Sequence, residues 1–149
     1  MTFHNPTLAR CVTTADMMCA RDRRAAAQQQ LLSLHKLPLV SFTLNIPGPV
    51  KRTALAELAF NSGLRILEEA LGAPVDKRIV RAHTGCEALL VYRHTASRLK
   101  EVCLQIEGNR PVGRLYDLDV LEADGTKLSR TTPRTCLLCG APVTACARS

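Results

Sequence analysis

The sequence predicts an α+β fold, a ferredoxin-like βαββαβ core in which helices cover one face of a mixed or antiparallel sheet. Apolar periodicity from residue 37 onward alternates in the order strand, helix, strand, strand, helix, strand. Proline and glycine fall between these runs, where turns are needed. The length of 149 residues and the hydrophobic share of 46% are typical of one globular domain, 1–149. We expect an extra N-terminal helix and a C-terminal hairpin with a cysteine knuckle.

Each predicted element follows from local signals. Residues 1–20 are weakly patterned, whereas 21–35 are rich in good helix formers and are followed by the helix-breaking Pro38. Residues 37–46 alternate like a strand and meet the Pro47-Gly48-Pro49 turn. The remaining predicted elements are a helix over 51–71, strands over 76–83 and 87–95, a helix over 96–108, a strand over 113–122, and a turn at 124–125 leading into 127–130.

The charge balance indicates a polyanionic partner. The chain has 20 Lys and Arg against 13 Asp and Glu, a net charge of +7, which suits a phosphorylated ligand or an acidic protein, although a merely basic surface is the simpler interpretation. Aromatic residues make up only 3%, which disfavours base stacking and hence a nucleic-acid partner. No apolar stretch approaches the roughly 20 residues of a membrane span. We therefore expect a cytoplasmic protein without a membrane partner.

The stretch GRLYDLDVLE, residues 113–122, holds two acids within a strand pattern. Side chains alternate between the faces of a strand, so Asp117 and Asp119 share one face. Their repulsion would be offset by a divalent cation such as Mg²⁺ or by arginines, which also suit phosphates. Solvated acids at a sheet edge are the alternative. If helices cover only one face of the sheet, we expect this face to be the open one.

Three further features are candidates for chemistry. Lys51, in the first turn of a predicted helix after Pro47-Gly48-Pro49, could bind an anion, although the prolines remove backbone donors and by themselves favour a rigid turn. Glu87 begins a predicted strand and is either a third carboxylate or an exposed strand-end acid. The seven cysteines favour reduced thiols or a metal site over disulfides. Three of them, Cys136, Cys139 and Cys146, have the spacing of half a zinc site, but a fourth ligand is not visible nearby.

Seven motifs together resemble one enzyme family. They are RDRR, PLVSFTLNIPGPVK, FNSG, TGCEALL, GRLYDLDVL, LSR and PRTCLLCGAPVTACARS, running from about residue 21 to the last residue. Their order and internal spacing closely resemble the apo-citrate lyase phosphoribosyl-dephospho-CoA transferase family, also called citrate lyase holo-acyl-carrier-protein synthase.

The resemblance implies a single transferase domain that moves 2′-(5″-triphosphoribosyl)-3′-dephospho-CoA onto a serine of the citrate lyase acyl-carrier subunit and releases pyrophosphate. We place Asp117 and Asp119 as Mg²⁺ ligands and, with Arg114, as the catalytic residues. The residues assigned to substrate binding are Arg21, Arg24, Lys51, Glu87 and Arg130.

Two alternatives accompany this assignment. The first is a non-catalytic, zinc-stabilised basic module that binds nucleic acid or an acidic protein. The second concerns the acceptor, because a malonate decarboxylase carrier shares the prosthetic group. Members of the family continue beyond the CARS ending, so we expect this chain either to be a short member or to lack part of the natural C-terminus after its cysteine-rich segment, 134–149.

Overall fold

The computed structural model of this chain describes residues 10–109 and 111–129. Its elements are α1 (Thr14–His35), β1 (Leu39–Leu44), α2 (Ala54–Leu71), β2 (Asp76–Ala82), β3 (Gly85–Val91), α3 (Ala96–Gly108), the 3-10 helix η1 (Pro111–Leu115) and β4 (Tyr116–Leu121). The α+β class is confirmed. The four strands form one sheet in the order β2-β3-β1-β4, and every neighbouring pair is antiparallel.

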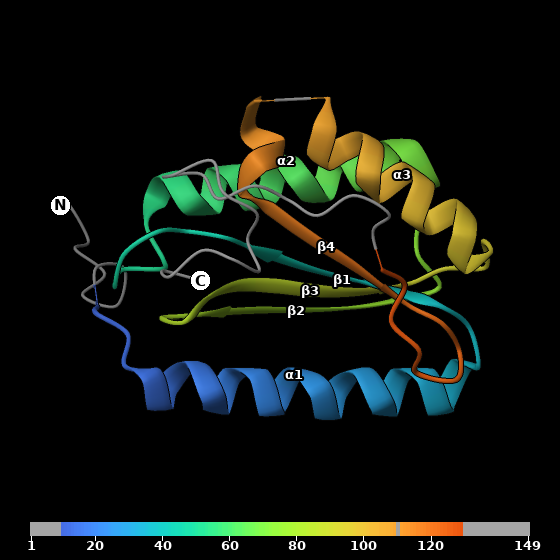
Figure 1. The fold of residues 1–149 in the computed structure, drawn as a ribbon, viewed down its shortest axis with the longest axis horizontal. Coiled ribbons are helices and arrows are strands. Elements are labelled where there is room, and N and C mark those ends of the chain that lie inside the picture. The colour runs from blue at the N-terminus through green and yellow to red at the C-terminus, as the bar shows by residue number, and fades with distance from the viewer. Residues whose placement is uncertain (1–9, 110, 130–149) are drawn as a thin grey trace, which may run out of the picture.

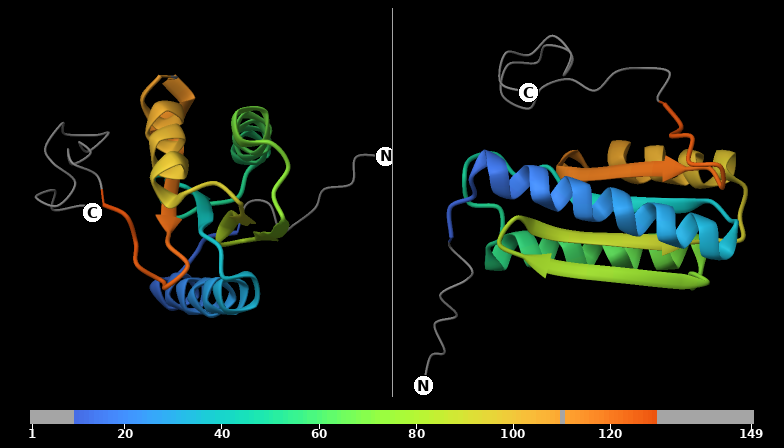
Figure 2. Two further views of the ribbon diagram at one scale, coloured as in Figure 1. Left: turned by 90° about the vertical axis from the view of Figure 1, so that its right-hand side faces the viewer. Right: turned by 90° about the horizontal axis from the view of Figure 1, so that it is seen from below.

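Helices cover both faces of this sheet (Figure 1). Helices α2 and α3 pack on one face, and α1 lies across the other, running obliquely over the strands (Figure 2, right). The expectation that the face bearing Asp117 and Asp119 is open is therefore wrong. This face is covered because Leu39, Leu89 and Val91 also point to it, and these apolar side chains are buried against α1.

The main core lies between the sheet and α2 with α3. The Phe42 ring stacks on Phe60 at a centroid distance of 5.0 Å and meets Tyr116 edge-on at 5.3 Å. Gly63 lets α2 approach this group, because a Cβ atom at that position would lie 2.4 Å from Cζ of Phe42. The Tyr116 hydroxyl donates to the carbonyl of Ala59 at 3.0 Å, which ties β4 to α2.

Helix α1 begins at Thr14 rather than at Arg21. Thr13 caps it through a capping box, in which the Thr13 hydroxyl accepts from the Asp16 amide at 3.1 Å and the Asp16 carboxylate accepts from the Thr13 amide at 3.0 Å. The helix ends at His35 and is capped by Lys36, whose left-handed backbone (φ 53°) lets its amide donate to the Leu32 carbonyl. No helix in the described part of the chain is long and apolar enough to cross a membrane.

The segment before β4 departs from the expected continuous strand over 113–122. Residues 111–115 instead form η1, in which Gly113 packs so tightly against the end of α3 that a Cβ would lie 2.4 Å from the Ile106 carbonyl oxygen. After β4 the chain reverses at the expected turn, where the Glu122 amide donates to the Thr126 carbonyl at 2.8 Å and Gly125 has a φ of 92°. The predicted cysteine knuckle lies outside the described residues.

Candidate functional site

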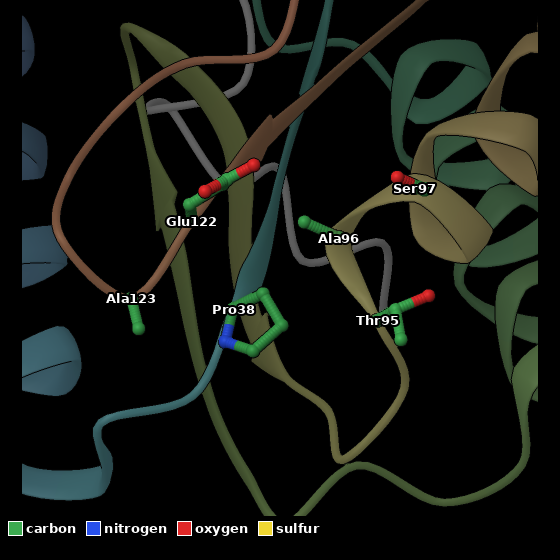
Figure 3. Close-up of a pocket in the computed structure, with 6 residues that line it drawn as sticks. All are labelled: Pro38, Thr95, Ala96, Ser97, Glu122 and Ala123. Atoms are coloured by element: carbon green, nitrogen blue, oxygen red, sulfur yellow. The ribbon is translucent and has the colours of Figure 1, made fainter.

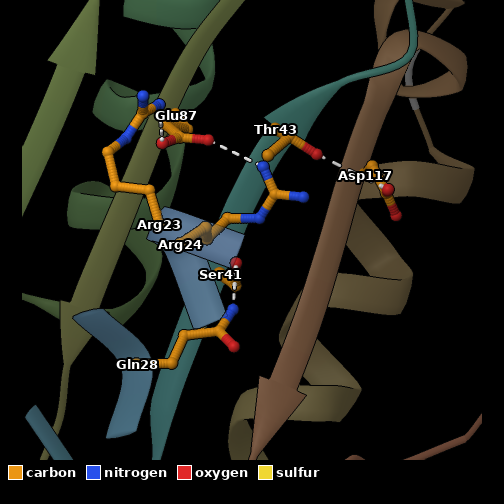
Figure 4. A network of polar contacts seen from close by, with 7 residues as sticks. All are labelled: Arg23, Arg24, Gln28, Ser41, Thr43, Glu87 and Asp117. Atoms are coloured by element: carbon orange, nitrogen blue, oxygen red, sulfur yellow. Dashed lines mark hydrogen bonds and ion pairs between the residues drawn. The ribbon is translucent and has the colours of Figure 1, made fainter. Parts of the chain in front are cut away.

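Helix α1 contacts the sheet through two chemically different zones. Its C-terminal half packs Leu31 and Leu32 against apolar strand residues. Near the middle of the helix, three polar side chains of α1 instead meet polar strand residues. Together they form what we call the polar cluster: Arg23, Arg24 and Gln28 of α1 with Ser41, Thr43, Glu87 and Asp117 of the sheet (Figure 4). Burying polar groups is costly unless they are paired, so the apolar zone stabilises the packing of α1 while the polar cluster is the candidate site.

The strand register brings three side chains of the polar cluster into one row. Thr43 of β1 pairs with Glu87 of β3 on one side and with Asp117 of β4 on the other. The Thr43 hydroxyl donates to Asp117 at 3.5 Å. In the next row facing α1, Ser41 pairs with Asp119, and Ser41 accepts a bond from Gln28 of α1 at 3.1 Å. Both aspartates therefore share one face, as their spacing predicts.

Glu87 holds two arginines of α1. Arg23 donates to its Oε1 at 3.0 Å, and Arg24 donates to its Oε2 at 2.7 Å. Glu87 is only 8% exposed, so its interpretation as an exposed strand-end acid is wrong. The reason is that β3 is an inner strand of the sheet and α1 lies over it. Each carboxylate oxygen already accepts a charge-assisted hydrogen bond.

The two aspartates differ in their surroundings. Asp119 forms an ion pair with Lys127 at 3.1 Å, and its side chain is one-third exposed, at 33%. Asp117 is half-buried and bonds to Thr43. Lys127 offsets part of the repulsion between the two carboxylates, a role that the sequence left to a metal or to arginines.

The carboxylates of Asp117 and Asp119 suit a Mg²⁺ ion that is shared with a phosphate ligand. Within 10–109 and 111–129, no group of three His, Cys, Asp or Glu side chains could hold a metal ion. Mg²⁺ is, however, commonly held by one or two carboxylates together with substrate phosphates. Asp117 and Asp119, two hard oxygen donors on one face, suit an ion that also binds a phosphate and not a self-contained metal centre.

The other predicted cations lie in different settings. Arg21 is exposed and lies on the same side of α1 as Arg24 and Gln28, at the i, i+3 and i+7 positions. Arg114 is exposed in η1, just before β4. Lys51 is not in the first turn of a helix, because α2 begins at Ala54 with Thr53 as its cap.

The Lys51 ammonium instead donates to the Ile46 carbonyl at 2.5 Å and so braces the turn at 47–49. Arg130 and the proposed zinc ligands Cys136, Cys139 and Cys146 lie outside the described residues. Cysteines in the described part of the chain, at positions 11, 19, 86 and 103, are free. Zinc binding therefore stays a prediction.

Four members of the polar cluster were not predicted individually from the sequence: Arg23, which falls within the RDRR motif, and Gln28, Ser41 and Thr43. Ser41 and Thr43 alternate in the strand LVSFTL in the same way as Asp117 and Asp119 do in YDLDVL. Gln28 follows Arg24 at i+4 on α1. The two strands therefore share a two-residue period of polar side chains. This pattern predicts a shared polar site only once β1 and β4 are known to be neighbours.

The structure also contains a pocket of about 310 Å³ near the far end of β4 (Figure 3). Its lining residues are Pro38, Thr95, Ala96, Ser97, Glu122 and Ala123. These include a carboxylate but no lysine or arginine, which makes the pocket poorly suited to a polyphosphate. The polar cluster, with its arginines, is the better candidate for an anionic ligand.

Comparisons with known proteins give the family. The family model for apo-citrate lyase phosphoribosyl-dephospho-CoA transferase matches residues 12–149. A probable apo-citrate lyase phosphoribosyl-dephospho-CoA transferase of Vibrio cholerae serotype O1 (strain M66-2) is 37% identical over 155 residues, covering 98% of this chain and 86% of the relative. An apo-citrate lyase phosphoribosyl-dephospho-CoA transferase of Escherichia coli O7:K1 is 38% identical over 146 residues, covering 92% and 79%. With matches over nearly the whole chain, this protein belongs to the apo-citrate lyase phosphoribosyl-dephospho-CoA transferase family.

Proposed function

We propose that this protein transfers 2′-(5″-triphosphoribosyl)-3′-dephospho-CoA to a serine of the acyl-carrier subunit of apo-citrate lyase and releases pyrophosphate. Membership of the family makes it an enzyme, a transferase. The observation that carries the finer proposal is the polar cluster, where an arginine pair and the Asp117 carboxylate meet at one end of the sheet face under α1. We include in the proposal a cytoplasmic location and a ferredoxin-like arrangement, which the strand order β2-β3-β1-β4 supports.

The proposed reaction is a displacement at phosphorus. The serine oxygen of the carrier forms a bond to the α-phosphorus, the bond from that phosphorus to the bridging oxygen of the β-phosphate breaks, and the serine proton is released. Such reactions depend mainly on positioning and on neutralising the charge of the phosphates. A site that offers arginine donors beside carboxylates suits both tasks.

The residues have distinct proposed roles. Arg24 uses one terminal nitrogen on Glu87, and a guanidinium has five N–H donors, so further donors remain for phosphate oxygens. Arg21 and Arg114 are exposed and would add to the phosphate contacts. Asp117 and Asp119 would hold Mg²⁺, which when bound neutralises phosphate charge and stabilises the leaving pyrophosphate.

The test is mass spectrometry of the acyl-carrier subunit. The full chain is incubated with apo-carrier subunit, the triphosphoribosyl donor and Mg²⁺, and pyrophosphate is measured in the same reaction. We expect the carrier to gain the mass of the prosthetic group with one pyrophosphate released per carrier, and no reaction when the acceptor serine is replaced by alanine. Pyrophosphate release without carrier modification would contradict the proposal, and preferential modification of a malonate decarboxylase carrier would change the acceptor.

A further inference from the structure

We propose that Glu87 is a positioning residue, which fixes the guanidinium groups of Arg23 and Arg24 for phosphate binding and itself touches neither substrate nor metal. This inference rests on the proposed function, since it names the residue that organises the same site. It also replaces the sequence-based assignment of Glu87 as a substrate-binding residue.

Accessibility supports this division of roles. The Glu87 side chain is 11% exposed, whereas the side chains of Arg24 and Arg23 are 23% and 49% exposed. Both carboxylate oxygens are occupied, one by each arginine. A ligand arriving from solvent therefore reaches the guanidinium groups and not the carboxylate beneath them.

The energetic reason lies in the flexibility of arginine. A free arginine side chain loses much of its rotamer entropy when a ligand immobilises it. Anchoring each guanidinium by one charge-assisted bond to Glu87 removes part of this cost before the ligand binds, which is preorganisation. The pairing of the strands also places the anchored guanidinium groups on the same sheet face as Asp117, because Thr43 lies between Glu87 and Asp117 and all three residues face α1.

Two other roles for Glu87 predict different results. If its carboxylate were only a negative charge near the site, Glu87→Gln would strengthen phosphate binding, because it removes repulsion. If it were a metal ligand, the same substitution would raise the Mg²⁺ concentration needed for binding. A positioning role predicts weaker phosphate binding with an unchanged Mg²⁺ requirement.

Titration calorimetry with inorganic triphosphate as the probe tests the inference on the full chain, at several Mg²⁺ concentrations. We expect Glu87→Gln to bind triphosphate about tenfold more weakly, because the two guanidinium groups then become ordered only when the ligand binds. Glu87→Asp keeps the charge but withdraws it from the arginines, so it should weaken binding as well. In the Arg23→Ala/Arg24→Ala background, Glu87→Gln should cause no further loss.

The matched control is Gln30→Ala. Gln30 accepts a bond from Arg78 of β2 at 2.9 Å, so the substitution removes another polar contact between α1 and the sheet outside the polar cluster. Its triphosphate affinity should equal that of the wild type. Circular dichroism shows whether each variant is folded. If Glu87→Gln does not fold, the comparison of Glu87→Asp with the wild type tests the positioning role.

The outcomes separate this inference from the proposed function. If the wild type binds triphosphate and the folded Glu87 variants bind it equally well or more tightly, the positioning role is overturned. The proposed transfer to the carrier would be unaffected by that result. A raised Mg²⁺ requirement also overturns the positioning role, in favour of a metal ligand. Absence of triphosphate binding by the wild type overturns the phosphate site and the positioning role together.

Discussion

Gly63→Ala tests the close contact between α2 and the sheet. The added Cβ would lie 2.4 Å from Cζ and 2.8 Å from Cε1 of Phe42, and 3.1 Å from Cζ of Tyr116. Both rings are fully buried and packed against each other edge-on, so neither has room to turn away. The helix must therefore move away from the sheet or the two strands must shift.

Two opposing effects set the magnitude. Overpacking a dense core costs about 1–3 kcal/mol, and the rigid ring contacts place Gly63→Ala at the upper end. Replacing glycine by alanine inside a helix returns about 1 kcal/mol. We therefore expect a net loss of about 2 kcal/mol in the free energy of unfolding, which lowers Tm by about 6 °C in a chain of this size.

The assay is thermal and urea unfolding of Gly63→Ala beside Gly108→Ala. A Cβ at Gly108, the last residue of α3, would meet no heavy atom within 4 Å, so this control should leave the stability unchanged or slightly raised. Phe42 lies between two residues of the polar cluster, and Tyr116 directly precedes Asp117, so carrier modification should fall as well. A Gly63→Ala protein as stable as the wild type would refute the reasoning.

Three further predictions concern charged and buried groups. Asp117→Asn and Asp119→Asn should each lower carrier modification about a thousandfold, equal to about 4 kcal/mol of barrier, with little change in Tm; near-normal transfer in either would exclude that residue as an essential metal ligand. The hydrogen bond from His35 lowers the pKa of Asp76 below its ordinary 3.8. The ionised Asp76 therefore stabilises the folded protein at pH values above 3.8, and this stabilisation is lost as the pH falls through the lowered pKa. When the pH is lowered, the Tm of Asp76→Asn should accordingly fall less steeply than the Tm of the wild type. An identical dependence of Tm on acidic pH in the two proteins would contradict this. Burial raises the pKa of the Cys103 thiol to about 12, so iodoacetamide followed by peptide mass mapping should leave Cys103 unmodified until the protein unfolds.

Local sequence determined the identity and order of most elements. Apolar periodicity with proline and glycine punctuation placed α3 at the residues where it lies, and β1 and α2 within a few residues of their ends. The start of α1 was also encoded, in the capping box of Thr13 and Asp16, but the prediction of this helix rested on the helix formers of 21–35 and did not use the cap. Two-residue alternation likewise sufficed to place Asp117 and Asp119 on one face.

Tertiary structure alone decided what those carboxylates face. Strand β1 pairs with β3 and β4, which come from distant parts of the sequence, and local periodicity carries no information about which strands become neighbours. That pairing aligns Thr43 with Glu87 and Asp117. The packing of α1 over the same face then converts Glu87 from an apparent surface acid into a buried anchor for two arginines, because a charge beneath a helix must find partners that a solvated charge does not need.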